Sequence, residues 1–263
     1  MTDFGLEDDF VGTCKGVIKQ IAPEAEVLDV THGIPPQHVL QGALVLAHTL
    51  PYMPVGVHVA VVDPGVGGDR KPLALRGTDG RLYVGPDNGI LFLAADRLGG
   101  VQEATEIAEP AYMLESVSRT FHGRDVFSPA AAHLANGVDL GELGPKLDPA
   151  GLVRLEVPEP TIGTARIRAT VLSIDRFGNV QLNLTRDHLE EVGIVPGTRV
   201  EVHIAFDRFF AVAARTFADV RPGDVVLYEN SYRHIGLALN QGNAAQAFGT
   251  KVGAELRLAP VRE

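Results

Sequence analysis

The sequence has little of three features that mark common classes of protein. Cys14 is the single cysteine among 263 residues, and there is no tryptophan. One cysteine excludes an internal disulfide framework and fits a reducing compartment. The lack of tryptophan leaves little material for stacking the bases of single-stranded nucleic acid. No run of about 18 apolar residues occurs, so no membrane span is expected.

Basic residues are also in short supply. The chain has 23 Lys and Arg against 33 Asp and Glu, a formal charge of -10. Binding to a phosphate backbone needs clustered cations, so we expect no nucleic-acid partner, and the acidity is explained by solubility. The first residues show no basic region followed by an apolar core, so we expect no signal peptide and a cytoplasmic location.

The first part of the chain alternates between helical and extended patterns. Such alternation predicts an α/β domain over residues 1–157 with a mostly parallel sheet. The expected helices are 9–21, 37–50, 90–98 and 125–136, and the expected strands are 26–30, 56–62 and 81–84.

The run Pro158-Glu159-Pro160 breaks regular structure, so we expect a linker over residues 158–164. Beyond it, period-two alternation predicts strands at 165–174, 199–205, 225–228 and 255–258. Residues 165–263 are therefore expected to form a smaller antiparallel, barrel-like β domain. Thr185 is the expected N-cap of a short helix ending near residue 192.

Residues 59–70, read VAVVDPGVGGDR, carry the most functional information. A short β-branched run followed by glycines predicts a buried strand that delivers Asp63 into a flexible loop. Ligands bind beyond the carboxyl ends of strands in open parallel sheets. The alternative is that Asp63 only opens a turn before Pro64.

Two further loops bring charged groups to the same crevice. Residues 2–5 and 8–12 place acidic residues before an amphipathic stretch, and residues 119–125 place His122 among charges before another. A parallel sheet whose first loop is 2–5 needs a strand before it, yet only Met1 precedes it. We expect either that this strand is cut short or that this edge of the sheet is rearranged.

Together with residues 86–89 (PDNG) and 175–179 (DRFGN), these three loops resemble the S-adenosylmethionine hydroxide adenosyltransferases. That family is related to the fluorinating and chlorinating enzymes that use the same substrate. Each motif is weak alone, but five occur in the same order with compatible spacing. The resemblance covers essentially the whole chain.

The resemblance implies an enzyme that hydrolyses S-adenosyl-L-methionine to adenosine and L-methionine, with no cofactor. The leaving group of this reaction is a neutral thioether, so no acid has to protonate it. The site needs a positioned water, a base and a cation. Asp63, Arg70 and His122 are similar to the family's water-activating residues.

The same resemblance implies the substrate contacts. Asp3 looks like the carboxylate that accepts both ribose hydroxyls, Asn179 like the reader of the adenine edge, and Phe217 like the ring that packs on adenine. The groups expected at the methionine moiety and the adenine rim are Asp175, Ser231, Asn243 and Ala244.

Four departures from the halogenating relatives favour hydroxide transfer. Those enzymes have an aromatic residue at Gln37, a tyrosine or similar side chain at Asp63 and a serine at Gly123, whereas a carboxylate at position 63 repels halide. They also carry an insertion for which the short turn at 76–80 leaves no room. The resemblance further implies a homotrimer with sites between subunits.

Other interpretations remain open at this point. Asp3, Asp63, His38 and His122 are possible metal ligands, but they lack a metal-binding spacing and Arg70 would repel a cation, so no metal is expected. The chain could also be a sensor that binds S-adenosylmethionine or adenosine without turnover, or a hydrolase of another nucleoside derivative.

Overall fold

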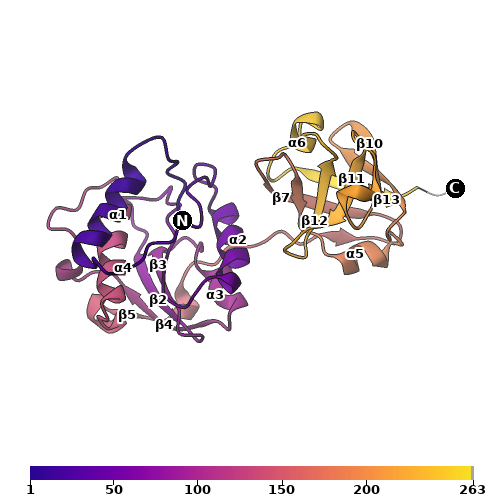
Figure 1. Cartoon of the computed structure of the whole chain (residues 1–263). Helices are drawn as coiled ribbons and strands as arrows, with labels where there is room; N and C mark the ends of the chain where they lie inside the picture. Colours follow the sequence, from indigo (N-terminus) through magenta and orange to yellow (C-terminus); the bar gives the residue numbers. More distant parts are fainter. Residues whose placement is uncertain (262–263) are drawn as a thin grey trace. The chain divides into compact units, whose positions relative to one another are not determined.

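The computed structural model of the protein describes residues 1–261 and divides the chain into two compact units (Figure 1). The first unit is Met1–Leu155, and the second begins at Glu156. Each unit has its own hydrophobic core. Within the expected linker, strand β6 (Thr161–Ile162) pairs with β7 (Ile167–Ile174) of the second unit.

A five-stranded sheet in the order β1-β3-β2-β4-β5 forms the centre of the first unit. Its strands are β1 (Val57–Val59), β2 (Pro72–Gly77), β3 (Leu82–Pro86), β4 (Val101–Glu106) and β5 (Lys146–Leu147). Only β1 and β3 run parallel among these described strands, and the other three pairs are antiparallel.

The prediction of a mostly parallel sheet is therefore wrong. Strands β2 and β3 follow each other through a tight turn, in which Gly77 N donates to Arg81 O at 2.8 Å and Gly80 has φ +84°. A turn this short joins only antiparallel strands, since a parallel pair needs a long crossover.

Helices cover both faces of this sheet (Figure 1). The helices are α1 (Phe10–Ile21), α2 (Val39–Thr49), α3 (Phe92–Arg97) and α4 (Ser128–Ala135), which confirms the four predicted helices with narrower bounds. Leu73 and Leu75 share a core with α2 and α3, whereas Ala74 between them packs toward α4. This alternation follows from the period-two geometry of a strand.

The edge next to β1 is rearranged. Thr2 forms a parallel bridge with Val61, and Val61 N donates to Met1 O at 3.0 Å. The segment 26–30 joins no ladder in the described chain, although Thr31 just after it accepts a bond from Thr2 N at 3.1 Å. The strand predicted at 26–30 is therefore wrong, because its backbone has no strand to pair with.

The second unit contains a closed seven-stranded barrel, which confirms the smaller barrel-like β domain. The order is β7-β8-β12-β11-β10-β9-β13, and β13 pairs back with β7. Besides β7, its strands are β8 (Val180–Leu182), β9 (Arg199–Ile204), β10 (Asp207–Ala213), β11 (Val225–Glu229), β12 (Ile235–Leu239) and β13 (Glu255–Pro260). The β10–β11 pair is parallel, and the other barrel pairs are antiparallel.

Two short helices flank the barrel. Helix α5 (Arg186–Glu191) begins after Thr185, whose N–H donates to Nδ1 of His188 at 3.2 Å, so the predicted helix start is confirmed. Helix α6 (Ala244–Ala247) begins at Asn243, whose Oδ1 accepts from Gln246 N at 2.8 Å. Such caps satisfy the free backbone N–H groups at a helix start.

Candidate active site

Asp63 lies where the buried run beside β3 leaves the sheet. Ala60, Val61 and Val62 are at most 3% exposed, and the loop after them carries Gly67 at φ +76°. A Cβ at Gly67 would lie 2.2 Å from Arg119 O, so only glycine fits. This close approach packs the loop that holds Arg70 directly against the loop that holds His122.

Asp63, Arg70 and His122 form one connected group. Arg70 Nε donates to Asp63 Oδ1 and Oδ2 at 3.1 and 3.0 Å, and Nη2 lies 2.5 Å from Oδ2. The same Nη2 lies 2.8 Å from His122 Nδ1. The Asp63 and Arg70 side chains are only 6% and 9% exposed. Arg70 also lies 5.3 Å from the centroid of the Phe127 ring.

This geometry fixes the state of the imidazole. A guanidinium has donors only, so His122 Nδ1 must accept and the ring proton sits on Nε2. Burial and then the positive charge of Arg70 lower the pKa of His122 below its ordinary value, while Asp63 opposes this shift. His122 is therefore neutral at pH 7.

A small hollow of about 220 Å³ opens over this group, and Asp3, Gln37, Asp63 and His122 line it. Asp3 Oδ2 accepts from the backbone N of Gln37 at 2.9 Å. Gln37 has φ +67°, a strained conformation for a non-glycine residue that often marks a site. The structure thus brings together Asp3, Asp63 and His122 from three loops, with Arg70 beneath them.

Asp125 is a residue that the sequence interpretation missed. It is fully buried, accepts from Ser118 N at 2.8 Å, and binds Arg124 Nε at 2.5 Å. Burial alone would raise its pKa, but the hydrogen bonds from Arg124 and Ser118 lower it overall. These contacts hold the loop that carries His122. The sequence signal that could have identified Asp125 is a carboxylate directly before the apolar pair Val126-Phe127.

The expected substrate contacts of the second unit lie partly around a separate hollow of about 390 Å³. Asp175, Asn179, Phe217 and Ser231 line it. Asp175 Oδ2 accepts from Asn179 Nδ2 at 2.8 Å, and Asp175 Oδ1 accepts from Asn179 N at 2.9 Å. The ring centroids of Phe217 and Tyr228 lie 4.8 Å apart. Tyr228, Gln181 and Arg215 also line this hollow and were not predicted.

Asn243 and Ala244 do not line this hollow. Ala244 is fully buried, and the side chain of Asn243 lies where a Cβ on Gly178 would be, 2.1 Å from Asn243 Oδ1. Ala245 N donates to Gly178 O at 2.9 Å. This segment therefore supports the turn 175–179.

Residues 1–261 contain neither a cluster of metal ligands nor a membrane-spanning helix. No group of three or more His, Cys, Asp or Glu side chains is placed to hold a metal ion, and Asp3, Asp63, His38 and His122 form no such group. No helix among these residues is long and apolar enough to cross a bilayer.

Comparison with known proteins shows which family the chain belongs to. Residues 1–144 match the N-terminal domain of the SAM hydroxide adenosyltransferases, and residues 169–257 match their C-terminal domain. The chain belongs to this family. Its resemblance to the family, first seen in five short motifs, is thereby confirmed.

Individual relatives agree with this assignment. A protein from Salinispora arenicola named (R)-S-adenosyl-L-methionine hydrolase is 47% identical, covering 98% of this chain and 95% of its own. A fluorinase from Actinopolyspora mzabensis is 30% identical over 98% of this chain and 95% of its own. A solved structure of an uncharacterized conserved protein from Thermotoga maritima has a TM-score of 0.89 and 34% identity, covering 98% of both chains.

Proposed function

We propose that this protein hydrolyses (R)-S-adenosyl-L-methionine to adenosine and L-methionine. The observation that carries the proposal is the buried contact of Asp63, Arg70 and His122 beneath a hollow that Asp3 also lines. The 47% identical relative bears the name of this activity, and it spans nearly the whole chain.

In the proposed mechanism, a water held above Asp63 and His122 attacks C5′ in line with the departing sulfur. One C5′–O bond forms as the C5′–S bond breaks, and methionine leaves as a neutral thioether. The water loses one proton to Asp63, and the Nε2–H of His122 orients its oxygen. Arg70 fixes both side chains and stabilises the developing hydroxide. General base catalysis supplies about 10²–10⁴-fold of the acceleration, and alignment with exclusion of water supplies more.

The substrate roles follow the family pattern and stay proposals. Asp3 accepts the ribose hydroxyls, Asn179 reads the adenine edge, and Phe217 packs on adenine. Asp175 and Ser231 bind the methionine moiety. Asn243 and Ala244 act through the turn 175–179, because they lie against Gly178.

Halide is a poor nucleophile for this site. Asp63 places negative charge beside the hollow, and Gly123 offers no hydroxyl. A Cβ at Gly123 would lie 2.9 Å from Cζ of Phe4, so a serine there requires Phe4 to move. We therefore favour water over chloride or fluoride.

We further propose that the protein needs no metal or cofactor, acts in the cytoplasm, and forms a homotrimer in which neighbouring subunits complete each site. Mixing tests the trimer. Inactive His122→Ala chains and Asn179→Ala chains that bind the substrate weakly are dissociated, reassembled together and assayed at a substrate concentration well below KM. The mixture should then exceed the mean activity of its two components, because some sites carry neither substitution. Verified mixed trimers whose activity does not exceed this mean would place each site within one chain.

Product analysis of the purified protein tests the activity itself. With S-adenosyl-L-methionine, chromatography should show adenosine and methionine in equal amounts, with or without a chelator. A sensor would release no adenosine, and a hydrolase of another nucleoside derivative would leave the substrate intact. Loss of activity on chelation, restored by a divalent ion, would overturn the metal-free mechanism.

A further inference from the structure

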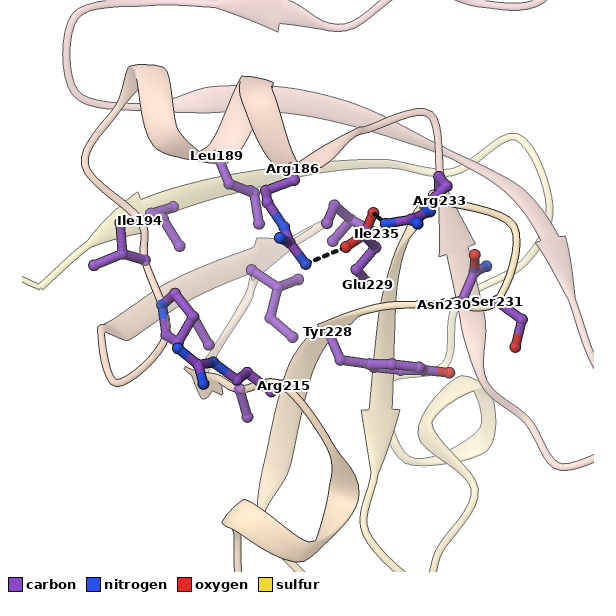
Figure 2. Close-up of a pocket in the computed structure, with 15 residues that line it drawn as sticks. Arg186, Leu189, Ile194, Arg215, Tyr228, Glu229, Asn230, Ser231, Arg233 and Ile235 are labelled. Carbon is purple, nitrogen blue, oxygen red and sulfur yellow. Dashed lines mark hydrogen bonds and ion pairs between the residues drawn. The ribbon is translucent and has the colours of Figure 1, made fainter.

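A further hollow of about 440 Å³ lies in the second unit (Figure 2). It shares Arg215 and the segment 228–231 with the hollow that Asn179 lines. It is lined from α5, the 194–196 loop, the segment 213–215 that ends β10, β11, and the segment 230–235. The proposed reaction uses Ser231 in the wall that the two hollows share and assigns no role to the rest of this hollow. Arg186 and Arg233 line it and do not line its neighbour, so the two hollows can be altered separately.

The charge of this hollow contrasts with the rest of the chain. Arg186, Arg215 and Arg233 line it with a single carboxylate, Glu229, whereas the chain as a whole carries a formal charge of -10. Arg186 Nη2 contacts Glu229 Oε2, and Arg233 Nη1 lies 3.5 Å from Glu229 Oε1 (Figure 2). Two positive charges therefore remain uncompensated at the wall.

Donor groups are also left over. In the part of the chain that the structure describes, the guanidinium of Arg215 makes no hydrogen bond or ion pair, and only its backbone N donates, to Asp219 Oδ2 at 3.0 Å. Arg186 and Arg233 each use one nitrogen on Glu229. A guanidinium offers five N–H donors in a planar fork that matches carboxylate and phosphate oxygens.

Most of the remaining lining is apolar. Leu189, Ile194, Leu227 and Ile235 face this hollow and are at most 6% exposed, so they belong to the barrel core. A volume of about 440 Å³ is within the range of small-molecule sites, which combine apolar walls with a few placed polar groups. Inorganic ions alone would leave the apolar part of the hollow in water.

We propose that this hollow binds a small organic anion, separate from the substrate of the proposed reaction. Its carboxylate or phosphate group pairs with Arg215 and with the free N–H groups of Arg186 and Arg233. Its apolar body lies against Val195, which lines the hollow and is 48% exposed.

Titration calorimetry of the full chain without S-adenosylmethionine tests this site. Hexyl phosphate should bind saturably, and inorganic phosphate and hexanol, which each carry half of the required chemistry, should bind at least tenfold more weakly. Arg233→Gln, which alters this hollow and not its neighbour, should weaken hexyl phosphate about tenfold or more, as expected for hydrogen bonds to a charged group. Arg221→Gln is the matched control, since Arg221 is exposed and lines neither hollow.

A variant that is expected to strengthen binding makes the test more specific. Glu229→Gln removes the competing carboxylate and frees Arg186 and Arg233, so it should tighten hexyl phosphate severalfold. Circular dichroism and thermal unfolding verify that each variant is folded. Absence of saturable binding at millimolar hexyl phosphate would overturn the proposal, as would equal weakening by Arg221→Gln or weaker binding by Glu229→Gln. Because no hydrolysis is measured, failure here leaves the proposed function untouched.

Discussion

The two hollows proposed to handle the substrate differ in how they are built. In the first unit, the Asp63 and Arg70 side chains are at most 9% exposed and bind each other. In the second unit, Phe217 is 36% exposed and Ser231 is also exposed. Preorganised charges act strongly where water is excluded, whereas an open aromatic surface supplies binding energy. The first hollow is thus suited to the chemical step and the second to holding the ligand.

Removing the central carboxylate or imidazole should give the largest effect. Asp63→Asn and His122→Ala should each lower kcat by about 10²–10⁴-fold, because each deletes a group that orients or deprotonates the water. KM should change little. Steady-state kinetics measure both values. Near-normal kcat in either variant would contradict the assigned roles.

Disturbing the contact between the Arg70 loop and the His122 loop should give the next largest effect on kcat. Gly67→Ala places a Cβ where Arg119 O lies 2.2 Å away, so the Arg70 loop must shift. A misplacement of about 1 Å can cost about 10²-fold in rate, and we expect a loss of that order in kcat. Gly137→Ala is the control, since Gly137 has a similar φ of +92° but open space around it. Equal losses in both variants would remove the loop contact from the mechanism.

Changes in the second unit should act on binding. Phe217→Ala should raise KM about tenfold, since stacking on a base contributes about 1–3 kcal/mol. Asn179→Ala should raise KM by a similar factor, since it removes hydrogen bonds to the adenine edge. The kcat at saturation should stay within a fewfold of the parent value. A large fall in kcat with unchanged KM would show that the second unit takes part in the chemical step.

The smallest expected effect is on stability and lies away from both hollows. Burial, and then the nearby Arg81, lower the pKa of His58 to about 4. The folded state therefore binds fewer protons than the unfolded state below pH 6.5, and stability falls as the pH drops from about 6.5 toward 4. Discounted for partial exposure, the loss between pH 7 and pH 5 is about 1 kcal/mol. Urea unfolding of His58→Gln should show a smaller loss, and an identical loss would assign it to other groups.

Local patterns predicted the parts of this molecule that local physics decides. The four helices of the first unit and the delivery of Asp63 follow from apolar periodicity and from glycines placed after a short β-branched run. Strand direction does not follow from periodicity, so the sheet was predicted as parallel although the turn at Gly80 makes β2 and β3 antiparallel.

The missed features depend on contacts between distant segments. Gly67 against Arg119, and Asp125 beneath Ser118, are visible only once the loops are folded together. The structure places Asp175, Asn179, Phe217 and Ser231, which the resemblance named, around one hollow, and their roles stay predictions. It could not show that the Asn243 side chain caps α6 and lies against Gly178.

Isotope transfer tests the central claim most directly. The protein is incubated with S-adenosyl-L-methionine in water enriched in ¹⁸O, and the products are analysed by mass spectrometry. Attack on C5′ predicts one ¹⁸O atom in the 5′-hydroxyl of adenosine and none in methionine. Labelled adenosine should form much more slowly with His122→Ala than with the parent protein. Unlabelled adenosine, or labelled adenosine formed equally fast by His122→Ala, would contradict water activation by Asp63, Arg70 and His122.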